Sequence, residues 1–149
     1  MDRALYAGEL FLKGYNCAQA VAMAFCDVTG LDEAFTAKMA SSFGGGMGRM
    51  REVCGAVSGM LMVAGLLYGY DSQDDDQVKM EHYALVQQLA EKFRAQVGSI
   101  VCRDILKNPP SDPNPTPRTA EYYAQRPCAR MVMLATEILE AYILEHPVK

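Results

Sequence analysis

Apolar side chains recur three or four residues apart along almost all of this 149-residue chain, and no useful stretch alternates as a β-strand would. The pattern predicts an all-α fold. Start and stop signals place helices at residues 3–13, 17–29, 33–43, 52–69, 74–97, 101–107, 119–125 and 128–145. A chain of this length typically forms one domain. We therefore expect a single domain, 1–149, folded as an antiparallel bundle of about five long and two or three short helices.

A proline-rich segment interrupts the helical pattern. Five prolines fall within residues 108–117, and proline in a helix interior removes a hydrogen bond and clashes with the preceding turn. Residues 108–118 are therefore expected to form an extended, stiff connector.

Residues 53–70 carry no charge and resemble a membrane span in composition. The segment is slightly short for a span and is rich in glycine. Gly55 and Gly59 have the four-residue spacing that lets two helices pack closely. We expect a buried central helix here and no membrane span.

The charge balance excludes several classes of partner. The net charge is −4, half of the residues are hydrophobic, and only 21% are charged. No basic stripe is present, so nucleic-acid binding is not expected. No basic amphipathic face indicates a membrane surface either. The high apolar content favours a homodimer.

The N-terminus, Met1-Asp2-Arg3-Ala4, does not resemble a secretory signal, because no basic region precedes an apolar run. The expected location is therefore the cytoplasm, where stable disulfides are uncommon. The five cysteines are an odd number, which also argues against a fully paired disulfide framework. In this setting cysteines more often serve redox chemistry or metal binding.

Four of the five cysteines fall where a helix is expected to begin. Asn16 suits the N-cap position before the first of them, Ser99 is a candidate cap before the third, and Pro127 suits the first turn beside the fourth. Free N–H groups and the helix dipole favour a thiolate there, and the thiolate is both the reactive and the metal-binding form. These candidate residues are Cys17, Cys54, Cys102 and Cys128.

Antiparallel topology predicts that these four cysteines share one end of the bundle. If successive long helices alternate in direction, the starts of the second and fourth helices and the end of the fifth lie together. The proline connector can bring Cys128 to the same end. Cys26 is expected nine residues into its helix, roughly 13 Å away at about 1.5 Å per residue, and so outside the cluster.

A glycine-rich segment precedes the helix of Cys54. Glycines before a helix let successive N–H groups converge on an anion or a thiolate, which makes Gly45, Gly46 and Gly48 candidate binding residues. Arg49 and Arg51 add positive charge and are expected to lower the pKa of Cys54. A flexible turn or a close helix crossing is the structural alternative for this segment.

Three segments together resemble one known family. Residues 16–21 (NCAQAV), 43–49 (FGGGMGR) and 54–59 (CGAVSG), followed by an apolar helix, are similar to the C-GCAxxG-C-C family. Cys102 and Cys128 fit the last two cysteines of its pattern, and the similarity spans roughly residues 14–145. Members are described as small, helical, redox-active proteins. The resemblance therefore implies a redox role for the four cysteines and names no substrate.

Three functions remain open from the sequence. The first is thiol–disulfide chemistry without a cofactor, in which Cys54 attacks, Cys17 resolves, and the redox partner is a protein or a small thiol. The second is zinc or an iron–sulfur cluster held by the same four cysteines. The third is a non-catalytic helical interaction module.

Overall fold

The computed structural model describes residues 2–148, and Met1 and Lys149, the ends of the expected domain, lie outside the described residues. Within this range all the regular elements are helices, apart from one isolated β-bridge, so the all-α prediction is confirmed. The elements are α1 (Arg3–Leu12), α2 (Cys17–Met23), α3 (Cys26–Thr29), α4 (Glu33–Ala40), η1 (Ser41–Phe43), α5 (Gly55–Tyr68), α6 (Asp76–Val97), α7 (Cys102–Leu106), α8 (Ala120–Gln125) and α9 (Cys128–Glu145).

The four longest helices are α1, α5, α6 and α9, with 10, 14, 22 and 18 residues. The expected number of about five long helices is therefore not confirmed. The difference arises mainly in residues 17–29, where a single helix was expected and α2 and α3 are found. The Ala24 carbonyl accepts a hydrogen bond from the Arg3 guanidinium, while the N–H of Val28 bonds to Phe25. A tertiary contact thus accompanies the break in the local helix.

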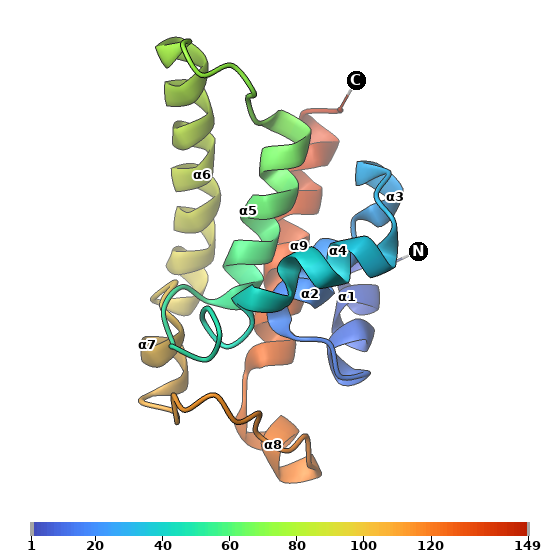
Figure 1. Ribbon diagram of the computed structural model, residues 1–149, viewed down its shortest axis with the longest axis vertical. Helices are drawn as coiled ribbons and strands as arrows, with labels where there is room; N and C mark the ends of the chain where they lie inside the picture. The colour runs from blue at the N-terminus through green and yellow to red at the C-terminus, as the bar shows by residue number, and fades with distance from the viewer. Residues whose placement is uncertain (1, 149) are drawn as a thin grey trace.

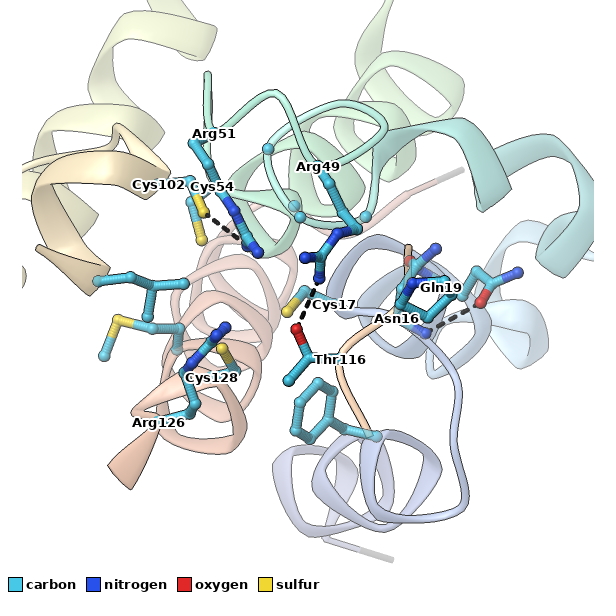
Figure 2. A pocket seen from close by; sticks show the side chains of 18 of the residues that line it. Asn16, Cys17, Gln19, Arg49, Arg51, Cys54, Cys102, Thr116, Arg126 and Cys128 are labelled. Atoms are coloured by element: carbon cyan, nitrogen blue, oxygen red, sulfur yellow. Dashed lines mark hydrogen bonds between the residues drawn. The ribbon is translucent and has the colours of Figure 1, made fainter. Parts of the chain in front are cut away.

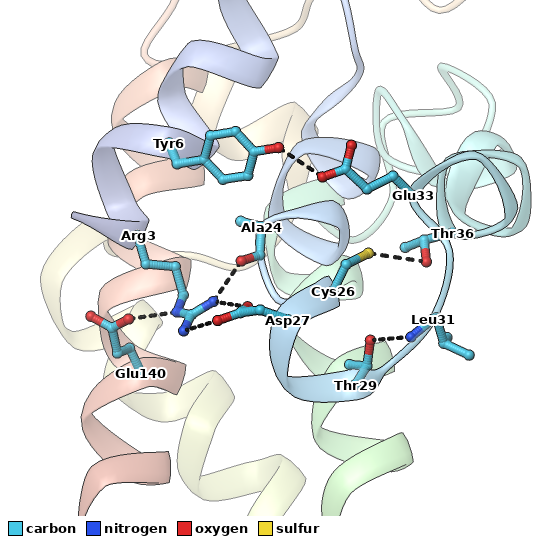
Figure 3. Close-up of polar contacts among 10 residues, drawn as sticks. All are labelled: Arg3, Tyr6, Ala24, Cys26, Asp27, Thr29, Leu31, Glu33, Thr36 and Glu140. Carbon is cyan, nitrogen blue, oxygen red and sulfur yellow. Dashed lines mark hydrogen bonds and ion pairs between the residues drawn. The ribbon is translucent and has the colours of Figure 1, made fainter. Parts of the chain in front are cut away.

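Arg3 is the centre of this contact. Its guanidinium also pairs with Asp27 of α3 and Glu140 of α9, as Figure 3 shows. The side chain lies over the Phe25 ring, 4.9 Å from its centroid. One arginine therefore joins three helices at the side of the bundle.

The core lies where α2, α5 and α9 meet, with α1 packed on α9 and α6 packed on α5 (Figure 1). Burial of apolar surface is the main stabilising contribution to such a core. The largest fully buried side chains are Phe11, Phe25, Phe93, Met60, Leu89, Leu139, Val21, Val57, Val132 and Thr136. No helix in residues 2–148 is long and apolar enough to cross a membrane.

The crossing of α2 over α5 depends on glycine. A Cβ atom at Gly59 would lie 2.6 Å from the Ala18 carbonyl oxygen, and one at Gly55 would lie 3.1 Å from Cβ of Cys17. The predicted close helix packing at these two glycines is confirmed. This contact brings the starts of α2 and α5 together.

Residues 108–118 contain no helix or strand, as predicted for the connector. The turn before it places Lys107 and Asn108 at positive φ, 57° and 60°. The connector then returns past the glycine-rich loop toward α8 at the end of the molecule where α2, α5 and α9 begin (Figure 1).

Candidate functional site

The structure brings four cysteines to one cavity of about 600 Å³ at this end of the bundle. Cys17 begins α2, Cys54 caps α5, Cys102 begins α7 and Cys128 begins α9, and all four line the cavity (Figure 2). The prediction that they share one end is confirmed.

Cys26 lies apart from this cavity, also as predicted, but its position within the helix was wrong. It is the first residue of α3, because the expected helix breaks before it. Its Sγ atom is 3.4 Å from Thr36 Oγ1 and forms a hydrogen bond with it (Figure 3). Cys26 is thus a free cysteine outside the cavity, and its substitution can serve as a control for those of the cavity cysteines.

A reciprocal cap fixes the start of α2 and with it Cys17. Asn16 Oδ1 accepts a hydrogen bond from the Gln19 N–H, and Gln19 Oε1 accepts one from the Asn16 N–H, each at 2.9 Å. The predicted N-cap is confirmed. Its neighbour Gly44 approaches so closely that a Cβ atom there would lie 2.5 Å from the Asn16 side chain. The glycine-rich loop therefore packs directly on the cap that positions Cys17.

A two-residue antiparallel bridge positions Cys54 and Cys102. Val53 pairs with Val101, the N–H of Cys54 donates to the Ile100 carbonyl at 2.7 Å, and the N–H of Cys102 donates to the Glu52 carbonyl at 2.6 Å. This pairing could not be predicted from the sequence, since a single bridge lacks β-alternation. The bridge thus ties the start of α5 to the start of α7, and both cysteines line the same cavity (Figure 2).

The helix of Cys102 has a different cap from the one expected. Val101 is the N-cap, and Ser99 accepts from its N–H at 3.0 Å and donates to Asp104. Ser99 therefore orders the approach to the helix without capping it.

The glycine-rich loop is a left-handed coil. Residues 45–49 all have positive φ, from 57° to 69°, and Arg51 has a φ of 62°. Such angles are easy for glycine and cost other residues roughly 1–2 kcal/mol each. The N–H groups of residues 47–52 all donate to backbone carbonyls of residues 42–47. The N–H of Gly48 is therefore not available to an anion, and the expectation that it would be is wrong.

The loop instead directs two arginines at the cavity (Figure 2). Arg49 donates through Nε to the Asp112 carbonyl and through Nη1 to Thr116 Oγ1, both at 2.8 Å. Arg51 donates through Nε to the Pro110 carbonyl at 2.9 Å and through Nη1 to Cys102 Sγ at 3.7 Å. Both arginines therefore tie the proline connector across the cavity.

Two further arginines line the cavity and were missed in the sequence. Arg118 donates to the carbonyls of Phe11 and Tyr15 and lies 4.2 Å from the Phe11 ring centroid. Arg126 lies 5.0 Å from the Tyr122 ring centroid. Arg126 could have been predicted as a cavity residue, because it lies two residues before Cys128 in the sequence.

The surroundings separate the four thiols by acidity. Burial raises the pKa of Cys54 to about 12, although the N–H groups of Ala56 and Val57 partly oppose this. Burial also raises the pKa of Cys102, with Arg51 acting in the opposite direction. The expectation that Arg49 and Arg51 would lower the pKa of Cys54 is wrong, because Arg51 bonds to Cys102 and Arg49 to the connector.

Cys17 and Cys128 form a coupled pair. The interaction with Cys17 lowers the pKa of Cys128 to about 7, with help from Arg126, Arg118 and Arg51 and against the effect of burial. The interaction with Cys128, together with burial, raises the pKa of Cys17. These surroundings favour a thiolate at Cys128 over one at Cys17.

The described residues 2–148 do not contain three or more histidine, cysteine or acidic side chains placed to hold a metal ion. The four cavity cysteines are thus not placed to hold a metal ion together in this structure. The arrangement consists of one thiol with a lowered pKa, three thiols with a raised pKa and four arginines around the same cavity.

A family model matches residues 15–142 and carries the description "Putative redox-active protein (C_GCAxxG_C_C)". Because the match covers most of the chain, the chain belongs to this family. No curated protein and no solved structure matches the chain.

Proposed function

We propose that this member of the C_GCAxxG_C_C family performs thiol–disulfide exchange with Cys128 as the attacking thiolate and Cys17 as the resolving thiol. One arrangement carries the proposal: Cys17 and Cys128 begin α2 and α9 and line the same cavity, where Cys17 and three arginines lower the pKa of Cys128. A thiol with a pKa near ambient pH is the most effective attacking group, since it is both ionised and nucleophilic.

The exchange proceeds in two steps. Cys128 Sγ⁻ attacks one sulfur of a disulfide R–S–S–R′, forming Cys128–S–S–R and releasing R′S⁻, which takes up the Cys17 proton. Cys17 Sγ⁻ then attacks Cys128 Sγ, forming the Cys17–Cys128 disulfide and releasing RS⁻. Two electrons pass from the cysteine pair to the substrate, and a dithiol reductant restores the pair.

Cys54 is less suited to the first attack than the sequence indicated. With its pKa raised to about 12, almost none of it is thiolate at neutral pH, and the thiolate is the nucleophile. We assign Cys54 and Cys102, which line the same cavity and both have a raised pKa, to a second couple that stays protonated during the first exchange.

Trapping of the mixed disulfide tests the assignment. In a Cys17→Ala variant treated with a small disulfide, we expect one substrate thiol to remain attached at Cys128, because the resolving thiol is missing. The matched control, Cys26→Ala, should complete the exchange and hold no adduct. Intact-mass and peptide mass spectrometry read both results. An adduct on Cys54 in place of Cys128 would refute the assignment.

A further inference from the structure

Arg51 is a buried side chain of the cavity that keeps one unpaired hydrogen-bond donor. It is only 4% exposed, and its Nη2 atom has no hydrogen-bond partner although Nε and Nη1 are both bonded. A buried charged donor without a partner is costly, so such groups are normally paired. The position and the missing partner together indicate that a ligand supplies the acceptor.

The rest of the cavity wall has the same sign of charge. Four arginines line it and no aspartate or glutamate does, in a chain whose net charge is −4. None of the four forms a salt bridge within residues 2–148. Low-dielectric walls lined by one sign of charge attract ligands of the opposite sign. The arginines are Arg49, Arg51, Arg118 and Arg126.

The cavity is larger than an inorganic anion requires. Its volume of about 600 Å³ lies within the range of roughly 300–1,000 Å³ typical of sites for organic ligands. Phe11, Ile105, Leu106 and Met131 give it apolar wall beside the thiols. The ligand should therefore combine hydrocarbon with anionic groups.

We infer that the cavity binds a small disulfide that carries carboxylates, with Arg51 Nη2 donating to a carboxylate while the disulfide lies at Cys128. The anionic part of this inference stands on the arginines alone, whereas the disulfide part rests on the proposed function. Guanidinium groups match carboxylate geometry well, which favours this anion. Atoms and electrons balance as in the exchange described above, and a dithiol remains the reductant.

Three disulfides that differ mainly in charge test the inference. They are 3,3′-dithiodipropionate, bis(2-hydroxyethyl) disulfide and cystamine, with charges of −2, 0 and +2 at neutral pH. The single-turnover rate of each with the reduced protein is divided by its rate with N-acetylcysteine amide, a thiol without a carboxylate, because leaving-thiol pKa also affects exchange. We expect the dianion to react about tenfold or more faster than the neutral disulfide, and the dication to be slowest. Equal normalised rates would overturn the anion preference and leave the exchange itself standing.

Substitutions of arginine test whether the preference for the anionic disulfide arises in the cavity. Arg126→Gln should reduce it severalfold, whereas Arg130→Gln, the same change at an exposed residue of α9 outside the cavity, should not. Arg51→Lys keeps the charge but loses the guanidinium geometry, and should weaken the preference while thermal unfolding reports that the fold is kept. An unchanged preference in both Arg126→Gln and a folded Arg51→Lys would contradict the inference.

An unreactive ligand separates binding from exchange. Suberate has the length and charge of dithiodipropionate without a disulfide, and 1,8-octanediol is its neutral counterpart. By calorimetry we expect suberate to bind the reduced protein and the diol to bind at least tenfold more weakly. If suberate binds but no disulfide reacts, the proposed exchange fails and the anion site stands. If suberate fails to bind better than the diol, the anion site is refuted.

Discussion

Removal of the Cys17 thiol should change the acidity of Cys128 more than any other single substitution. The interaction with Cys17 is the largest influence lowering the pKa of Cys128, and burial, the next largest, acts in the opposite direction. In Cys17→Ala we therefore expect the pKa of Cys128 to rise from about 7 to 8.5, the ordinary value of a cysteine, or above.

The size of the effect follows from the thiolate fraction. At pH 7 a thiol of pKa about 7 is roughly half ionised, whereas one of pKa about 8.5 is roughly 3% ionised, a loss of about 16-fold. Nucleophilicity rises with pKa, with a Brønsted slope of about 0.4–0.5, which increases the rate of each thiolate about four- to sixfold. The net rate at pH 7 should fall only about three- to fourfold, while at pH 10 the variant should react faster than the parent.

The assay is the rate of Cys128 modification by iodoacetamide from pH 5 to 10, followed by peptide mass spectrometry. The midpoint of the profile is the decisive quantity, because the two rate effects partly cancel at any single pH. Cys17→Ser retains a donor and should keep the midpoint nearer 7, and Cys26→Ala should leave it unchanged. A midpoint near 7 in Cys17→Ala would refute the coupling of the two thiols.

Three further predictions concern stability. The folded pKa of Cys54 is raised to about 12, so the unfolded chain loses this proton first. The free energy of unfolding should therefore fall by on the order of 4 kcal/mol as the pH rises from about 9 to 12. Chemical denaturation should show a flatter decline with pH in Cys54→Ala, and an equal slope would contradict the raised pKa. Asn16→Ala removes the reciprocal cap of α2 and should lower the free energy of unfolding by about 1 kcal/mol, and a Tm within error of the parent would rule out that contribution. Gly59→Ala forces a Cβ against the Ala18 carbonyl and should lower the free energy of unfolding by about 1–3 kcal/mol. Gly65→Ala in the same helix meets open space and should raise it by about 0.5–1 kcal/mol. The reverse order of Tm values would contradict the helix crossing.

Local chemistry explains which parts of the fold were predictable. The start of α2 follows from Asn16 and that of α4 from Asp32, because each caps the helix that begins at the next residue. The break after α2 was not predictable, since it accompanies a bond from Arg3 to the Ala24 carbonyl, 21 residues apart in sequence.

The gathering of the cysteines was likewise predictable, and their individual acidities were not. Cys17, Cys54 and Cys102 share one end because α2, α5 and α7 all begin there, with α6 leading back to it from the far end of α5 (Figure 1). The acidity of each thiol depends instead on which side chains face it. The left-handed coil directs Arg51 to Cys102, and no sequence spacing specifies that direction.

The measurement that tests the central claim most directly is the identity of the first disulfide formed. The fully reduced protein is treated with less than one equivalent of a small disulfide at pH 7, quenched in acid, alkylated and mapped by mass spectrometry without reduction. We predict the Cys17–Cys128 bond, with Cys54, Cys102 and Cys26 still reduced. A first bond that includes Cys54, or no bond between any of the cavity cysteines, would contradict this account.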